Sequence, residues 1–308
     1  MIDQVVGSSD VPTVTSTNRL MALLEITRPT TSLGAGLLAL TSVRITVLND
    51  ASGAGLWDTP RTLGFAIGWF MLAQAVFAVN DAFDAPIDAI SHPSRAIPSG
   101  RVRRADAMMF GVAIGVFGSV VLALIAPPLG IVGLLYGVTS WLYSARLKTW
   151  NGLVANATVA GLIGLVPASV AVAGSPVEPV LWFPIPIFLG VLAREVLNDI
   201  EDVDGDRASG RPTLPITLGH QLAYRLCAAT WVGFVPTVYL TAIAEPNLRT
   251  PAFVIFASLL NVVVLAIAAT LLRERADLLP RLQLVTKLVL FAYVVVMLVA
   301  LHLPVSGR

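Results

Sequence analysis

Long apolar stretches separated by short polar turns run through almost the whole chain. About 20 consecutive apolar residues are enough for a helix to cross the hydrocarbon core of a bilayer. The pattern predicts nine such helices, at residues 21–48, 62–89, 105–126, 128–142, 152–172, 180–200, 219–243, 251–272 and 282–303. Proline and glycine at the breaks between them are typical of turns. The sequence therefore predicts an all-helical, nine-span bundle.

The ends of this pattern set the domain boundaries. Residues 1–18 are polar and rich in Ser and Thr, and they lack the basic and apolar regions of a signal peptide. We expect them to form a disordered tail. No later turn is polar enough to separate two soluble domains, so residues 19–308 are predicted to form a single membrane domain.

Composition agrees with a membrane protein. Hydrophobic residues make up 56% of the chain and charged residues only 13%, whereas soluble domains carry about 25% charged residues. The formal net charge of +1 gives no general attraction to nucleic acid, which is excluded as a partner.

Basic residues are distributed unevenly between the two sides of the predicted bundle. One side holds Arg19, Arg28, Arg95, Arg101, Arg103, Arg104, Arg146, Lys148, Arg207, Arg211, Arg273, Arg275 and Arg281. The other side holds Arg61, Arg249 and Arg308, with Arg44 near it. Because Lys and Arg accumulate on the cytoplasmic side of membrane proteins, the N-terminus and the acidic segments described next are expected to face the cytoplasm. The lack of a transit signal favours the plasma membrane of a prokaryote.

The first acidic segment ends the second apolar stretch. Asn80, Asp84 and Asp88 follow one another at intervals of four residues and form one stripe on a helix. Like charges at this spacing repel one another, and a divalent cation with a preference for oxygen ligands offsets that repulsion. A solvated helix end is the alternative interpretation.

The second acidic segment ends the sixth apolar stretch. Glu195, Asp199, Asp202 and Asp206 fall on one face if the helix extends that far. The two segments together hold nine of the 19 acidic residues, and charged residues in a membrane segment indicate function.

Basic residues accompany both acidic segments. Arg95, Arg146 and Lys148 lie at the same predicted end of the bundle as the carboxylates. A metal ion combined with Lys and Arg suits a diphosphate and stabilises it as a leaving group. For Arg146 and Lys148, ordinary anchoring at the cytoplasmic surface is an equally weighted alternative.

The motifs in these segments resemble those of the UbiA superfamily of intramembrane prenyltransferases. The first motif runs from Asn80 to Asp88 and continues through residues 95–100, and the second covers residues 194–206. The segment 213–216, Arg28-Pro29, residues 143–148 and Asn156 fit as well. The second motif is most similar to that of digeranylgeranylglyceryl phosphate synthases, followed by chlorophyll synthases.

This resemblance implies a nine-helix UbiA-type bundle with a central cavity capped by cytosolic loops. It also implies a reaction in which Mg²⁺ binds an isoprenyl diphosphate, whose ionisation gives an allylic cation that an acceptor captures. Carried over by position, the metal ligands are Asn80, Asp84, Asp88, Asp199, Asp202 and Asp206. Arg95, Arg146 and Lys148 are expected to hold the diphosphate, and Asp88 or Asp199 to accept the acceptor's proton.

The function predicted from the sequence is Mg²⁺-dependent transfer of an isoprenyl group to a lipid or another amphipathic acceptor that enters from the membrane. Two alternatives stay open at this point. A terpene cyclase of the same fold uses the prenyl diphosphate without an acceptor. A cation-coupled transporter also places carboxylates inside a membrane, although the accompanying Arg and Lys residues favour a polyanion.

Overall fold

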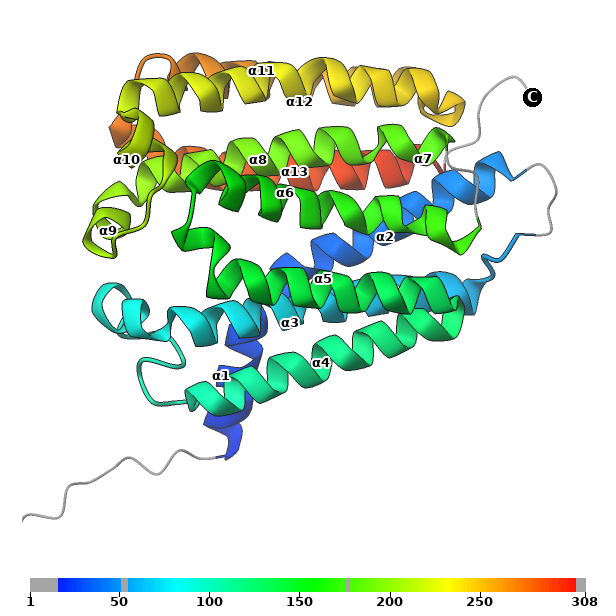
Figure 1. Ribbon diagram of the computed structural model, residues 1–308. Helices are drawn as coiled ribbons and strands as arrows, with labels where there is room; N and C mark the ends of the chain where they lie inside the picture. The colour runs from blue at the N-terminus through cyan, green and yellow to red at the C-terminus, as the bar shows by residue number, and fades with distance from the viewer. Residues whose placement is uncertain (1–15, 51–54, 175–177, 303–308) are drawn as a thin grey trace, which may run out of the picture.

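A computed structural model describes residues 16–50, 55–174 and 178–302, and these residues form helices and turns without a β-strand (Figure 1). The α-helices are α1 Ser16–Thr27, α2 Pro29–Asn49, α3 Thr59–Ser91, α4 Arg104–Ile125, α5 Pro127–Ala145, α6 Gly152–Ala168, α7 Glu178–Trp182, α8 Pro184–Glu201, α9 Val203–Ala208, α10 Leu214–Leu218, α11 His220–Ala244, α12 Pro251–Leu271 and α13 Leu279–Ala300. Short 3₁₀ turns are η1 Leu147–Thr149, η2 Ser169–Ala173, η3 Pro246–Leu248 and η4 Ala276–Leu278.

Every predicted apolar stretch is largely helical, and each one after the first coincides with a single long helical segment. Eight helical segments among the described residues are long and apolar enough to cross a membrane, which makes this an integral membrane protein. The remaining stretch corresponds to α5, a helix of 19 residues that contains two prolines, three glycines and two tyrosines. It runs alongside α3 and α4 in the bundle (Figure 1).

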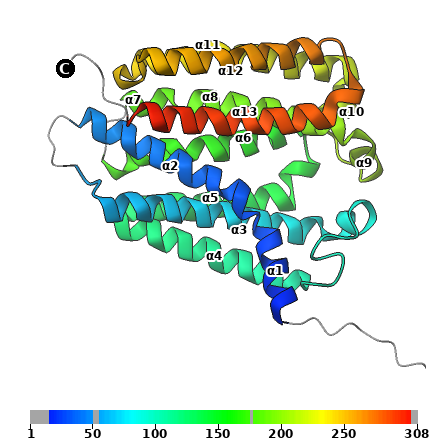
Figure 2. The same ribbon diagram turned by 180° about the vertical axis from the view of Figure 1, so that it is seen from behind.

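The first predicted helix, 21–48, is divided in two, contrary to the prediction of one continuous span. Arg28 adopts a left-handed backbone with φ 44° between α1 and α2. The break occurs here because Pro29 disfavours helical geometry in the residue before it. As a result, α1 lies across the bundle while α2 runs along it (Figure 2). The helix already begins at Ser16, within the predicted tail 1–18, and residues 1–15 lie outside the described residues.

The second acidic segment is also divided. Helix α8 ends at Glu201, and Asp202, with φ −92° and ψ 11°, separates it from α9. Asp206 therefore belongs to a separate short helix, and the expected single face of a continuous helix ends at Glu201.

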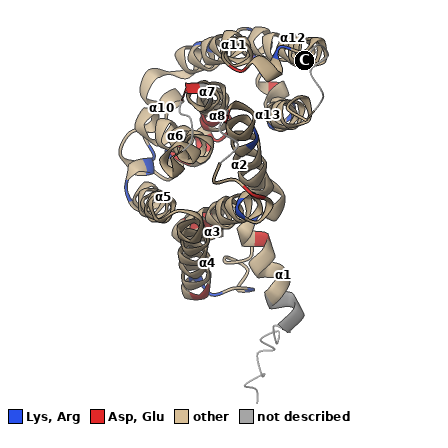
Figure 3. Ribbon diagram, turned by 90° about the vertical axis from the view of Figure 1, so that its right-hand side faces the viewer, with Lys and Arg blue, Asp and Glu red and all other residues tan. Residues whose placement is uncertain are grey.

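Close helix contacts hold the bundle together. The end-on view places α4 outside α3 at one edge and α11 and α12 beyond α8 at the other (Figure 3). A Cβ on Gly118 of α4 would lie 3.0 Å from the carbonyl oxygen of Gly68 of α3, so the two backbones touch directly. Small residues permit such contacts between membrane helices, where dispersion forces replace the hydrophobic effect. Trp69 adds an edge-to-face contact with Tyr136 of α5, at 5.2 Å between ring centroids.

Both acidic segments lie at the same end of the bundle. The C-terminal ends of α3, α5 and α8 and the N-terminal ends of α4, α6 and α11 meet there, together with α9 and α10 (Figure 1). The two acidic segments, 115 positions apart from Asp84 to Asp199, are thus brought together at one end of the bundle.

Candidate active site

Asp84 lies at the centre of a polar network near the end of α3. Its carboxylate accepts hydrogen bonds from Asn80 Nδ2 at 2.8 Å and from Arg211 Nη2 at 3.0 Å. Lys148, on η1, forms a short ion pair with the same carboxylate. The Asn80 side chain is held in turn by the Ser144 hydroxyl of α5, which donates to its Oδ1 at 3.2 Å. The Asn80 and Asp84 part of the predicted stripe is thus brought together with Lys148.

Two further carboxylates of α3 have arginine partners. Arg95 Nη1 donates to both carboxylate oxygens of Asp88, at 2.8 and 2.9 Å. Arg28 Nη2 donates to Asp81 Oδ1 at 2.7 Å, and its guanidinium carbon lies 5.1 Å from the centre of the Phe77 ring. The strained backbone of Arg28 is therefore fixed by an ion pair and a cation–π contact.

The second acidic segment approaches from α8 and α9. Asp199 accepts a hydrogen bond from Asn156 Nδ2 of α6 at 2.8 Å. Asp206 is buried and faces Arg211, with 3.6 Å between Oδ1 and Nη1. Asp202, at the break between the helices, is exposed.

Arg211 joins the two acidic segments, because its guanidinium contacts Asp84 of α3 and Asp206 of α9. Sequence reasoning assigned this arginine only to the positive side of the membrane. Its position five residues after Asp206, directly behind a glycine, is the only signal in the sequence. Gly210 adopts φ +70°, and this turn brings the backbone N–H of Arg211 back to the carbonyl of Asp206 at 2.9 Å.

The segment that carries Arg211 is also fixed from α6. The backbone N–H of Gly152 donates to the carbonyl of Pro212 at 3.0 Å. A Cβ on Gly152 would lie 2.8 Å from that oxygen and equally close to the Cα of Thr213. Only a glycine at position 152 leaves enough room for the backbone of residues 212 and 213 to lie against the start of α6.

Burial affects the charges in this network. Burial lowers the pKa of the Lys148 ammonium, and the neighbouring Asp84 carboxylate opposes that shift. Burial likewise raises the pKa of Asp206, and the Arg211 guanidinium opposes it. Each ionised group therefore depends on its partner of opposite charge to stay ionised.

The remaining predicted residues behave differently. Arg146 is exposed, and within the described ranges it makes no side-chain hydrogen bond or ion pair.

No three Asp, Glu, His or Cys side chains among the described residues are grouped as metal ligands. The carboxylate and amide oxygens nevertheless fit a hard divalent cation in their chemistry, and the assignment of the six metal ligands stays a prediction.

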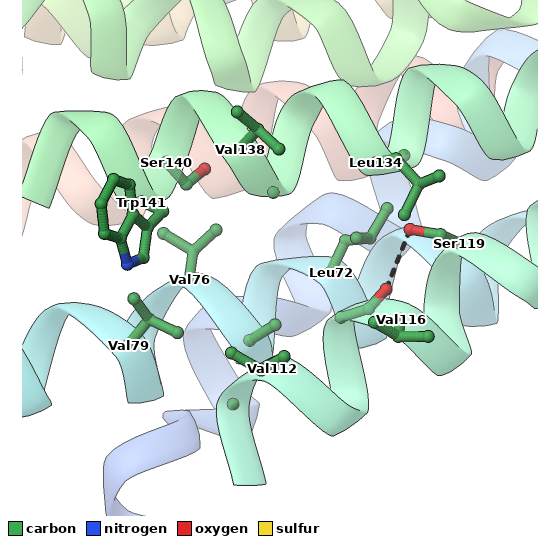
Figure 4. Close-up of a pocket in the computed structure, with 15 residues that line it drawn as sticks. Leu72, Val76, Val79, Val112, Val116, Ser119, Leu134, Val138, Ser140 and Trp141 are labelled. Carbon is green, nitrogen blue, oxygen red and sulfur yellow. Dashed lines mark hydrogen bonds between the residues drawn. The ribbon is translucent and has the colours of Figure 1, made fainter. Parts of the chain in front are cut away.

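A separate cavity lies between α3, α4 and α5. It has a volume of about 260 Å³ and is lined mainly by apolar side chains, among them Val76, Val112 and Leu134 (Figure 4). The hydroxyls of Ser119 and Ser140 donate to carbonyls of their own helices, so they do not make the cavity polar. None of the acidic residues lines it, and the polar network is therefore a distinct site.

Comparison with known proteins places these motifs in a family. The profile of the UbiA prenyltransferase family matches residues 45–293, which extends the resemblance beyond the motifs through α11 and α12 and into α13. The chain is similar to the digeranylgeranylglyceryl phosphate synthase of Methanopyrus kandleri, with 32% identity over 254 residues, 82% of this chain and 90% of the relative.

Solved structures have the same fold. A structure of a digeranylgeranylglyceryl phosphate synthase aligns with a TM-score of 0.72 at 23% identity, covering 92% of this chain and 99% of the other. A UbiA homologue from Archaeoglobus fulgidus, bound to geranyl diphosphate (GPP) and Mg²⁺, aligns with a TM-score of 0.59 at 14% identity, covering 90% and 99%. With a family profile that spans most of its length, the chain belongs to the UbiA prenyltransferase family and is a prenyltransferase.

Proposed function

We propose that the protein transfers a geranylgeranyl group from geranylgeranyl diphosphate to the free hydroxyl of a prenylated glyceryl phosphate. The observation that carries this proposal is the meeting of Lys148 and Arg211 at Asp84, between the two acidic segments. The similarity to digeranylgeranylglyceryl phosphate synthases supports this choice of donor and acceptor.

The cationic residues of the site are suited to a diphosphate. Arg95, Lys148 and Arg211 are each paired with a carboxylate, so their positions are fixed before a substrate arrives. A diphosphate placed among them accepts charge-assisted hydrogen bonds. These bonds strengthen as the bond between C1 of the prenyl group and the diphosphate oxygen breaks, because negative charge accumulates on the leaving group.

Mg²⁺ is the cofactor that the donor set suits, and when bound it neutralises diphosphate charge and favours departure of the leaving group. We propose that the oxygens of Asn80, Asp84 and Asp88 from α3 hold one ion. The carboxylate oxygens of Asp199, Asp202 and Asp206 hold a second ion.

The electrons of the broken bond remain with diphosphate, and the acceptor oxygen forms the new bond to C1. The hydroxyl proton passes to Asp88 or Asp199.

Several finer features belong to the same proposal. Helix α5 acts as the ninth membrane span of a UbiA-type bundle. A central cavity of this bundle is closed by the loops at the site end. This end faces the cytoplasm of a prokaryotic cell, as the excess of Arg and Lys indicates.

The proposal is tested with protein purified in detergent. Geranylgeranyl diphosphate and geranylgeranylglyceryl phosphate are supplied together, with Mg²⁺ or with EDTA, and diphosphate release and the lipid product are measured. We expect release that requires both Mg²⁺ and the acceptor, with one product molecule formed for each diphosphate. Release of diphosphate with a cyclised hydrocarbon and no acceptor would assign the protein to the terpene cyclases instead.

A further inference from the structure

Helices α8 and α13 pack against each other beside the site, and one contact fixes their register. A Cβ on Gly190 of α8 would overlap the side chain of Leu290 of α13. The two helices run in opposite directions, since α8 ends and α13 begins at the site end (Figure 1). Positions that follow Gly190 and positions that precede Leu290 therefore approach the site together.

Helical spacing places two polar residues on the faces that carry this contact. Arg194 lies four residues after Gly190, and Gln283 lies seven residues before Leu290, so each shares a face with the contact residue of its own helix. At 1.5 Å per residue, they lie about 6 and about 10 Å from the contact towards the site end. That difference of about 4 Å along the helices is within the reach of an arginine side chain.

Both residues have buried polar atoms without a partner. Arg194 Nε is buried and makes no hydrogen bond to any described residue, and the same holds for Nε2 and Oε1 of Gln283. A buried donor or acceptor that lacks a partner lowers the stability of the folded protein. Unpaired polar atoms on two neighbouring helices indicate a place where a polar ligand could supply the missing hydrogen bonds.

The arginine is already oriented for such a ligand. Its Nη1 lies 3.5 Å from the Glu195 carboxylate, and Asn198 Nδ2 donates to that carboxylate at 3.2 Å. This contact involves Nη1, whereas Nε, on the edge that it shares with Nη2, is buried and has no partner among the described residues. That edge can donate two parallel hydrogen bonds to a phosphate.

The position of Arg194 favours the phosphate of a second substrate over the diphosphate of the prenyl donor. Asp199 lies five residues further along α8, about 7.5 Å closer to the site end. An anion at Arg194 therefore lies deeper in the bundle than the diphosphate that the acidic segments hold. The head group of a second, lipid substrate fits this position, because its chain stays among apolar helices while its hydroxyl approaches the prenyl carbon.

We propose that Arg194 and Gln283 bind the phosphate group of the acceptor lipid, a monoalkylated glyceryl phosphate. This inference rests on the proposed function and adds a second anion site to it. Arg194 supplies the charge and the paired donors, and the Gln283 amide supplies a further hydrogen bond. The site selects a phosphorylated glycerol lipid over the corresponding uncharged lipid, because the latter leaves the buried polar groups unmet.

The test is equilibrium binding in detergent without donor, with a radiolabelled alkylglyceryl phosphate and the matching alkylglycerol as probes. We expect wild-type protein to bind the phosphate form more tightly. Arg194→Gln and Gln283→Leu should each weaken that binding about 10- to 100-fold, with little change for the alcohol. Arg225→Gln, an exposed arginine on α11, is the matched control and should bind as the wild type does.

Three further readouts separate this site from its alternatives. The KM for geranylgeranyl diphosphate should stay within about twofold in both variants, since a different anion site holds the donor. Gln283→Leu should also unfold at the same temperature or a higher one, because it removes an unmet amide. Inorganic phosphate added alone should compete weakly, because it lacks the alkyl chain.

An equal loss of donor and acceptor affinity would overturn the proposal, as would an unchanged preference for phosphate over alcohol. A wild-type protein that binds the alkylglyceryl phosphate but transfers no prenyl group would refute the proposed function. In that case the binding measurements on Arg194→Gln and Gln283→Leu would still decide the anion site.

Discussion

At the scale of single residues, Asp84 connects the two halves of the site. It is the one carboxylate that contacts Lys148 and Arg211 together among the described residues, and its side chain is only 14% exposed. Removing one partner from a buried ion pair costs about 3–5 kcal/mol, because the other charge stays buried. Asp84 therefore contributes to stability as well as to the proposed chemistry.

The substitution Asp84→Asn keeps the shape of this side chain and removes its charge. We expect the rate of diphosphate release to fall about 100-fold or more, together with a lower unfolding temperature in a thermal melt. The matched control is Asp204→Asn, in the second motif, whose side chain is 97% exposed. Full turnover in Asp84→Asn would contradict the role of this carboxylate.

Arg211 offers a second test at the same scale. Its guanidinium joins Asp84 and Asp206, so Arg211→Gln should loosen the contact between the two segments and remove a diphosphate ligand. We expect the KM for the prenyl diphosphate to rise about 10-fold or more. Arg207→Gln, on an arginine whose side chain is 64% exposed, should leave the KM unchanged in the same steady-state assay.

At the scale of elements, the site depends on how closely α6 approaches the segment after α9. Gly152 begins α6 and lies against Pro212 and Thr213, which directly follow Arg211. No side chain fits between these backbones. The position of Arg211 therefore depends on Gly152, a glycine of another helix.

The substitution Gly152→Ala should displace this segment and lower stability by about 1–3 kcal/mol, as overpacking does elsewhere. The rate of diphosphate release should fall as well. Gly161→Ala, in the same helix, is the control, because its Cβ would meet no atom within 4 Å. Thermal unfolding of the two variants side by side measures the difference, and equal melting temperatures would contradict the packing argument.

At the scale of the whole molecule, the proposed orientation can be measured. Cys227, the single cysteine of the chain, is fully buried, so the native protein gives little background with thiol reagents. Arg61, at the start of α3, and Arg207, in α9, are exposed, and these two segments lie at opposite ends of the bundle (Figure 1), so Arg61→Cys and Arg207→Cys place a thiol at each end. A reagent that cannot cross membranes should label only Arg61→Cys in intact cells and only Arg207→Cys in inverted vesicles. The reverse pattern would place the site outside the cytoplasm.

Sequence patterns predicted the features that depend on local periodicity. The long helices follow from apolar runs, and the spacing of Asn80, Asp84 and Asp88 was sufficient to locate the first acidic segment. The break at Arg28 was missed, although the proline after it is a known signal for a helix boundary.

The contacts that the sequence did not predict depend on distant packing. Arg211 reaches Asp84 across 127 positions of the chain because Gly210 turns the backbone and Gly152 admits the segment. The placement that we infer for Arg194 and Gln283 depends on the register of α8 and α13, which no local pattern specifies. Periodicity determines which face a residue occupies, but not which neighbour that face meets.

Helix α1 also defines how far the chain can be shortened. Arg101 donates to Glu25 of α1 from the loop that also carries Arg95, at 3.0 Å from Nη2 to Oε1. Ala22 and Ile26 pack in one cluster with Ala96 and Val102 of that loop. A fragment starting at Pro29 would keep every long membrane helix and every predicted metal and diphosphate ligand, yet it would lose Arg28 and release the loop that orients Arg95. The minimal active unit therefore starts at or before Ala22 and not at the first membrane-crossing helix.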